Sequence, residues 1–147
     1  MKPTNEMRVQ FPSRSINERL ARSVVSAFAT ALDPTVDELA DLRTAVSEAV
    51  TNCIVHAYPD KIGKIGLQMR MYEGGRLVVK VTDWGVGIPD IPQAMTPLFS
   101  TGGEDRAGLG FSVMESFCDK VRVRSREGRG TVVTLEKYIS ARRAEEG

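Results

Sequence analysis

The chain has 147 residues, of which 41% are hydrophobic and 27% charged, a composition ordinary for one soluble globular domain with a sizeable core. Its 20 basic and 19 acidic side chains leave a net charge of +1, so bulk electrostatics gives no reason to expect a nucleic-acid or membrane partner. No apolar run approaches the roughly 20 residues of a membrane span, and residues 1–7 lack the apolar core of a signal peptide. We therefore expect a single cytoplasmic domain spanning residues 1–147.

The N-terminal part of the chain changes from a strand pattern to a helix pattern. Residues 7–11 alternate apolar and polar side chains, which predicts a strand. Ser15 and Glu18 have the spacing of a capping box, and apolar residues then recur at helical spacing over 16–31. A first amphipathic helix is expected there.

Three arginines stay off the apolar stripe of this first helix: Arg14, Arg19 and Arg22. Charged residues in such positions are commonly a solvated helix face. They could equally present a basic stripe to an acidic partner, and the charge pattern leaves both interpretations open.

A second, longer helix follows the break at Asp33 and Pro34. Thr35 and Glu38 have capping-box spacing, and the apolar pattern continues to about Tyr58, before Pro59.

Two polar residues, Glu48 and Asn52, are four apart on this second helix and therefore share one face, at the margin of the apolar stripe. They could be a solvent-facing pair or a carboxylate and a carboxamide that face a common pocket.

Residues that often mark metal or nucleophile sites are sparse. His56 is the single histidine, so it is better explained as a packed or hydrogen-bonded helix residue than as a metal ligand or nucleophile. Cys53 and Cys118 have neither metal-ligand nor CxxC spacing, and they are predicted to be free, buried thiols.

The rest of the chain contains four segments with strand character: residues 64–72, 76–83, 121–125 and 131–135. Glycine-containing turns at 73–75 and 128–130 connect them in pairs, which predicts two hairpins.

Asp83 ends one of these strands and begins the sequence Asp-Trp-Gly-Val-Gly. Gly85 and Gly87 permit a sharp turn and a close approach of another group to the backbone. An ionised Asp83 only accepts hydrogen bonds, so it would accept from the exocyclic amine of adenine and repel the carbonyl oxygen of guanine. The pattern is also compatible with an ordinary turn between strands.

Residues 89–107 have little periodicity, and a loop of this length in a compact domain is commonly a functional lid or disordered. Gly108 and Gly110 follow, just ahead of a helix predicted over 111–118. Glycines before a helix N-terminus can offer backbone amides to phosphate, or they can be a flexible joint.

Four motifs now stand in one order: Glu-x-x-x-Asn on a helix, Asp-x-Gly-x-Gly after a strand, Gly-x-Gly at a helix, and Gly-Thr at a late strand. Together they resemble the Bergerat or GHKL family of ATP-binding domains. Around residues 47–52, 97–101 and 108–111 the chain more narrowly resembles the anti-sigma-F factors of spore-forming bacteria. The resemblance implies an α/β (α+β) two-layer sandwich, with helices on one face of a mixed, mostly antiparallel sheet.

The resemblance also implies roles at the phosphate end of an ATP site. Glu48 would be the general base, and Asn52 would be a ligand of Mg²⁺, a hard cation that takes oxygen donors. Gly108 and Gly110 would give amides to the phosphates, and Arg106 would reach the terminal phosphate.

At the adenine end, the resemblance assigns Asp83 to the adenine amine, with Thr131 supporting it through a water. Gly87 would lie close to the base, and Gly85 and Thr101 would also bind the nucleotide.

The implied function is that of an anti-sigma factor and ATP-dependent serine kinase. Such a protein would be a homodimer that binds the sporulation sigma factor F, with Arg22 at a partner surface, and that phosphorylates a serine of an anti-anti-sigma factor. It would bind neither nucleic acid nor membrane. The alternatives are the related regulators of stress-response sigma factors, a nucleotide-gated binding module without significant kinase activity, and a plain ATPase of the same fold.

Overall fold

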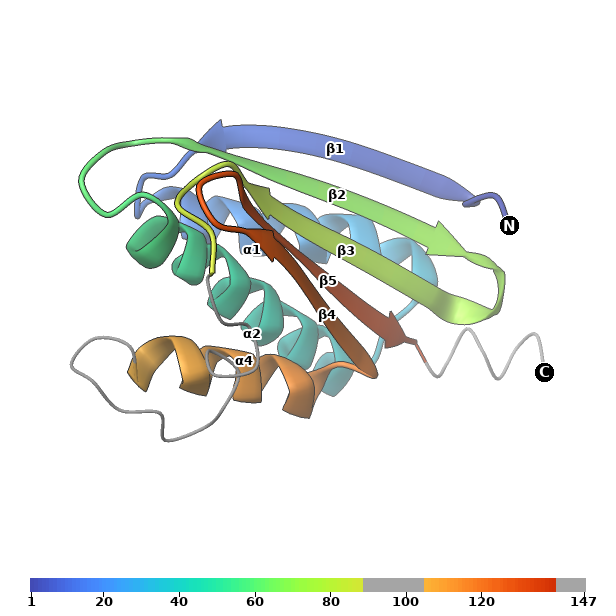
Figure 1. Ribbon diagram of the computed structural model, residues 1–147. Coiled ribbons are helices and arrows are strands. Elements are labelled where there is room, and N and C mark those ends of the chain that lie inside the picture. The colour runs from blue at the N-terminus through green and yellow to red at the C-terminus, as the bar shows by residue number, and fades with distance from the viewer. Residues whose placement is uncertain (89–104, 140–147) are drawn as a thin grey trace.

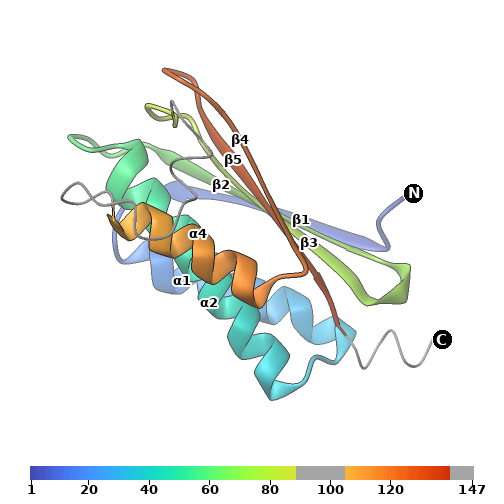
Figure 2. The same ribbon diagram turned by 60° about the horizontal axis from the view of Figure 1, so that its bottom comes forward.

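The computed structural model describes residues 1–88 and 105–139, and for residues 105–109 it describes the backbone only. One layer is a five-stranded sheet, and the other contains the helices, all on the same face of the sheet (Figure 1). The view in Figure 2 separates the two layers edge-on. The predicted two-layer architecture, with helices on one face, is confirmed.

The strands are β1 (Asn5–Pro12), β2 (Lys64–Tyr72), β3 (Arg76–Asp83), β4 (Lys120–Arg126) and β5 (Gly130–Tyr138). They are ordered β1-β2-β3-β5-β4, and all four pairs among the described residues run antiparallel. Every predicted strand is present, with ends within a few residues of those expected.

The helices are α1 (Asn17–Ala29), α2 (Val36–Asn52) and α4 (Asp105–Phe117), with short helical turns η1 (Thr30–Leu32), η2 (Cys53–Ala57) and η3 (Glu73–Gly75). No described helix has both the length and the apolar character needed to cross a membrane.

Strand alternation separates the two faces of the sheet. In β2, Ile65, Leu67 and Met69 are buried on the helix side, whereas the residues between them are partly exposed. Since successive side chains of a strand point to opposite faces, the core lies between the sheet and the helices, and the other face is polar.

Helix α2 begins as the sequence predicts. The Thr35 side chain accepts from the Glu38 backbone N–H, and the Glu38 carboxylate accepts from the Thr35 N–H, which completes the capping box. Past Asn52 the helix continues as the π-helical turn η2, which ends before Tyr58. Such π-turns are rare and are frequent at functional sites.

The start of α1 differs from the prediction. Ile16 is its N-cap, and no side chain caps it. Glu18 does not form a capping box with Ser15, because its carboxylate instead accepts from the Ser47 hydroxyl of α2 and pairs with Arg22. The tertiary partner therefore replaces the local one.

The buried stripe of α1 agrees only in part with the apolar pattern of the sequence, which includes Ile16, Leu20 and Phe28. Ala21, Val25 and Phe28 are buried, whereas Ile16 and Leu20 are 76% and 46% exposed. Helix α1 packs against α2, and its buried residues belong to the core between the helices and the sheet.

Candidate functional site

A cavity of about 70 Å³ lies between the end of α2, the turn after β3, and β5. The residues that line it are Ala49, Asn52, Cys53, His56, Ala57, Asp83, Gly87, Ile88, Phe111, Thr131 and Val133. The two polar residues on which the predicted ATP site depends, Asn52 and Asp83, therefore open into one cavity, although they come from a helix and a strand end.

Asp83 is the buried carboxylate of this cavity, with a relative exposure of 5%. Its Oδ1 accepts from the backbone N–H of Gly85 at 3.0 Å and of Thr131 at 3.2 Å, and its Oδ2 accepts from the Cys53 thiol at 3.5 Å. Burial raises the pKa of the Asp83 carboxyl, and these three donors oppose the rise. The side chain is thus held in one orientation.

The turn after Asp83 is packed tightly against the end of α2. The Val86 N–H donates to the Ala57 carbonyl at 3.0 Å, and a Cβ at Gly85 would lie 2.1 Å from that same oxygen. Gly87 has φ +79°, and a Cβ there would lie 2.3 Å from the Arg126 carbonyl. These two glycines are therefore required by backbone packing around the cavity, whatever they do for a ligand.

Glu48 and Asn52 lie at the other end of the site, facing α4. A Cβ built on Gly110 would lie 3.1 Å from Glu48 Oε2 and 3.3 Å from Asn52 Nδ2, so both side chains converge on one point of the α4 backbone. The predicted shared face is confirmed, and these residues do not simply face solvent. A Cβ at that position of α4 would require these two side chains to move by a few tenths of an ångström.

The Asn52 amide is an incompletely satisfied polar group. Its Nδ2 is buried and has no hydrogen-bond partner within the described part of the chain, an unusual state that calls for a ligand or water. Residues 1–88 and 105–139 contain no group of three or more His, Cys, Asp or Glu side chains able to hold a metal by themselves. A ligand or water that accepts a hydrogen bond would satisfy the Nδ2 donor of Asn52. The oxygen of the same amide is the kind of protein ligand that Mg²⁺ takes when phosphates and water supply the rest.

The chain is similar to known proteins over most of its length. The sequence profile of the histidine kinase-like ATPase domain matches residues 11–137. An anti-sigma F factor from Thermoanaerobacter sp. (strain X514) is 51% identical over 142 residues, covering 96% of this chain and 99% of that protein. An anti-sigma F factor from Caldanaerobacter subterraneus subsp. tengcongensis is 50% identical over 144 residues, covering 97% and 100%.

The chain belongs to the anti-sigma F factor family. Among solved structures, the RsbU and RsbW domains of a Mycobacterium tuberculosis protein align with a TM-score of 0.67 at 19% identity, covering 93% of this chain and 32% of that one. The histidine kinase domain of a blue-light activated kinase from Erythrobacter litoralis aligns with a TM-score of 0.54 at 26% identity, covering 74% and 48%. These similarities to solved structures concern the fold.

In this anti-sigma F family member, the predicted site residues fall into three groups. Those that line the cavity are Asn52, Asp83, Gly87 and Thr131. Those beside it are Glu48 and Gly110, which face each other, and Gly85, which packs on Ala57. Thr101 lies outside the described residues, and Arg106 and Gly108 are described only as part of the α4 backbone.

The predicted place of the two motif glycines ahead of a helix is wrong. Helix α4 begins at Asp105, so Gly108 is in its first turn and Gly110 is further inside. Only the first four N–H groups of a helix lack intrahelical partners, so the Gly110 amide is not free in this conformation. Inside α4, Gly110 lies beside Glu48 and Asn52, whose side-chain atoms would be 3.1–3.4 Å from a Cβ at this position.

Three residues of the site have roles that the motifs did not indicate. The Cys53 thiol, predicted simply to be buried, donates to Asp83. Tyr58 joins three elements, because its hydroxyl donates to the Lys64 carbonyl at 2.6 Å and accepts from the Trp84 N–H at 2.7 Å. His56 lines the cavity one turn after Asn52. The single indication of this in the sequence is that the two residues share a helix face.

A shallower groove runs beside Glu48 on the outer side of α2. Its lining includes Arg22 from α1 and Arg43, Thr44 and Ser47 from α2, with a volume of about 280 Å³. Arg22 pairs with Glu18 at 2.9 Å, so this arginine is tethered at the groove and is not simply solvated.

Proposed function

We propose that this chain is a single ATP-binding domain that acts as a cytoplasmic anti-sigma factor and serine kinase. It would use Mg-ATP, bind the sporulation sigma factor F, and phosphorylate a serine of an anti-anti-sigma protein. One observation carries the proposal: Asp83 and Asn52 open into one cavity, and Glu48 lies next to Asn52 on the same helix face. Anti-sigma F factors at 50% identity over nearly the whole chain support it.

The adenine end is suited to a neutral base with an exocyclic amine. The cavity walls are mostly apolar, and Asp83 Oδ1 is already occupied by two backbone donors. The Oδ2 atom, whose donor is the weakly bonding Cys53 thiol, is left to accept from the adenine amine. A guanine carbonyl in that place would be repelled by the carboxylate.

The phosphate end would perform the transfer. Asn52 would offer its amide oxygen to Mg²⁺, which when bound neutralises charge on the phosphates. Glu48 would orient the serine hydroxyl and accept its proton as the serine oxygen bonds to the terminal phosphorus. In the same displacement the bond between that phosphorus and the bridging oxygen of ADP breaks, and ADP leaves.

The protein substrate would approach from the α1 and α2 side. The groove lined by Arg22 and Arg43 also includes Glu48 in its lining, so a partner seated there could present a serine to the carboxylate. We propose Arg22 as a partner contact on this ground, and a homodimer by similarity to the family.

The test is Glu48→Gln in the full-length chain, with Glu115→Gln, an exposed carboxylate on α4, as the matched control. Phosphate transfer from labelled ATP to a purified anti-anti-sigma protein should fall about 10²- to 10⁴-fold for Glu48→Gln, with ATP affinity nearly unchanged. The control should transfer at the wild-type rate. An unchanged rate in Glu48→Gln would remove its role as base, and no transfer by the wild-type chain would favour a nucleotide-gated binding module.

A further inference from the structure

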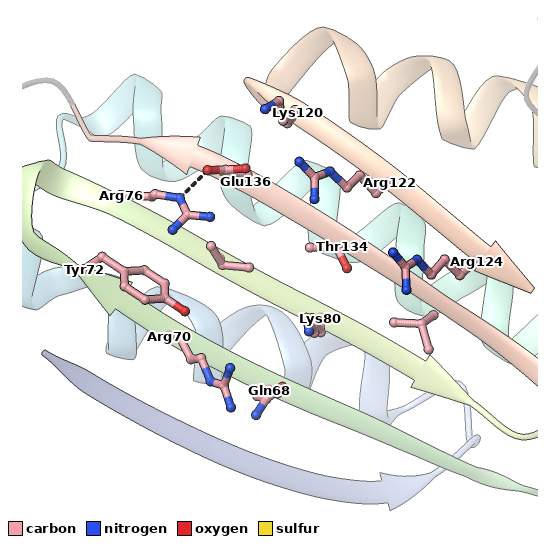
Figure 3. A pocket seen from close by; sticks show the side chains of 12 residues that line it. Gln68, Arg70, Tyr72, Arg76, Lys80, Lys120, Arg122, Arg124, Thr134 and Glu136 are labelled. Carbon is pink, nitrogen blue, oxygen red and sulfur yellow. Dashed lines mark hydrogen bonds and ion pairs between the residues drawn. The ribbon is translucent and has the colours of Figure 1, made fainter. Parts of the chain in front are cut away.

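A second recess lies on the opposite face of the sheet, away from the helices and the proposed ATP site. It is a groove of about 420 Å³ over β2, β3, β5 and β4 (Figure 3). Its lining contains six cations and one carboxylate, Glu136. The cations are Arg70, Arg76, Lys80, Lys120, Arg122 and Arg124. The whole chain, in contrast, has 20 basic and 19 acidic residues, so folding concentrates positive charge on this face.

The groove has the shape of a trough with a low floor and two cationic walls. In the sheet register, Thr134 of β5 lies between Arg122 of β4 and Lys80 of β3, as Figure 3 shows. Val132, also short, continues the floor. Adjacent strands are about 4.8 Å apart, so the two walls stand about 10 Å apart. That width accommodates one extended polypeptide strand.

Two of the six cations are already neutralised by neighbours. Arg76 forms an ion pair with Glu136, and Arg70 pairs with Glu6 at 2.9 Å. The other four cations, on β3 and β4, make no ion pair with any residue in the described ranges 1–88 and 105–139. The uncompensated charge therefore lies along the two sides of Thr134.

We propose that this trough binds an extended, acidic segment of a partner protein. Alternate residues of β4 carry cations, and residues two apart in a strand repeat every 6.6–7 Å or so. Side chains on one side of an extended peptide repeat at the same interval, so successive acidic groups of the bound segment would face Arg122 and Arg124 in step. Lys80 would meet acidic groups on the other side.

Other occupants fit the face less well. Single-stranded nucleic acid binds by stacking bases on aromatic rings, yet the Arg76 guanidinium covers the Tyr72 ring at 4.7 Å and the Lys64 ammonium covers the Trp84 ring at 4.7 Å. A second copy of this chain docked symmetrically through the same face would oppose cations with cations.

The experiment measures binding of a labelled peptide of alternating Glu and Thr, about ten residues long, to the full-length protein at low salt. A peptide of alternating Gln and Thr and an oligothymidylate serve as comparison probes. The variants are Lys80→Glu and Arg122→Glu, and the matched control is Arg19→Glu, an exposed arginine on α1 in the other layer.

We expect the acidic peptide to bind at least tenfold more tightly than the Gln peptide, with each trough variant losing at least fivefold and Arg19→Glu retaining wild-type affinity. Adenosine binding should stay unchanged in all variants, which separates failure here from failure of the proposed kinase. Equal binding of the two peptides, equal loss in Arg19→Glu, or tighter binding of the oligothymidylate with the same variant sensitivity would overturn the proposal. A change of oligomeric state in Arg122→Glu with peptide affinity intact would also overturn it.

Discussion

The two faces of the sheet are built from the same strands, yet the binding sites proposed on them would work by different physical means. On the helix side of β3, Asp83 is buried and receives three donors at fixed distances in a mostly apolar cavity. On the opposite side of the same strand, Lys80 stands in an open trough of cations. Strand alternation places these residues on opposite faces, although only three positions separate them in sequence.

The two proposed sites differ in how strongly their interactions depend on direction and on distance. A buried carboxylate acts over hydrogen-bond distance and discriminates between bases by donor and acceptor pattern. Exposed cations act over about 8–10 Å, are screened by salt, and tolerate many arrangements of acidic groups. We therefore expect perturbations of the cavity to be specific for nucleotide and to leave acidic-peptide binding unchanged.

The largest effect is expected for Gly85→Ala. The new Cβ would lie 2.1 Å from the Ala57 carbonyl and displace the acceptor of the Val86 N–H, so the free energy of unfolding should fall by about 3 kcal/mol and ATP affinity should fall with it. Urea unfolding and calorimetry measure both quantities.

Gly128→Ala is the control for that substitution. Gly128 has φ +79° but no atom within 4 Å of its Cβ position, so it should lose only about 1 kcal/mol, from backbone strain. An equal loss in both variants would show that the turn beside Asp83 is not tightly packed.

Asp83→Asn should weaken ATP binding about 10- to 100-fold, because the adenine amine loses a charged acceptor. The same change should not lower the unfolding free energy at neutral pH, since an amide oxygen can still accept from Gly85 and Thr131 while the buried charge is removed. Acidic-peptide binding at the trough should remain as in wild type. Loss of peptide binding would show that the two faces are coupled.

The Asp83 carboxyl also predicts a dependence on pH. Burial raises its pKa above the ordinary value of 3.8, so the folded state binds the proton more tightly than the unfolded state. The contribution of Asp83 to the free energy of unfolding is therefore largest at a pH below the ordinary pKa. It falls as the pH rises from the ordinary pKa to the raised pKa, and it is constant at higher pH. Urea unfolding at a series of pH values should show this fall in wild type and not in Asp83→Asn.

Adenosine affinity gives a second measure of the same titration. In the proposed site the ionised carboxylate accepts from the adenine amine, so affinity in wild type should decline on acidification, beginning above the ordinary pKa of an aspartate. Asp83→Asn should have a flat profile. A flat wild-type profile would exclude Asp83 as the adenine acceptor.

The smallest effect is expected for Cys53→Ala. Removing the thiol that donates to Asp83 Oδ2 should weaken adenosine binding about two- to fivefold. The pH at which adenosine affinity begins to fall on acidification should also be higher than in wild type. Cys53→Ser keeps a donor and should retain the wild-type onset. A shared onset in all three proteins would mean that Cys53 only fills space.

The sequence by itself determined the features that depend on neighbours along the chain. The capping box of Thr35 and Glu38, the shared face of Glu48 and Asn52, and the strand before Asp83 all follow from local periods and hydrogen-bond chemistry. Such patterns report which residues share a face. They do not show which residues from other segments of the chain will contact that face.

Only the tertiary structure decided the contacts between distant segments. Glu18 accepts from the Ser47 hydroxyl and does not form the expected cap. Gly110 lies inside α4 beside Glu48, and the Cys53 thiol donates to Asp83. The cationic trough likewise has no counterpart in a net charge of +1, because it arises when strand register brings Lys80 and Arg122 to the two sides of Thr134. Register and helix docking are set by packing across the whole core, and no local window of sequence contains that information.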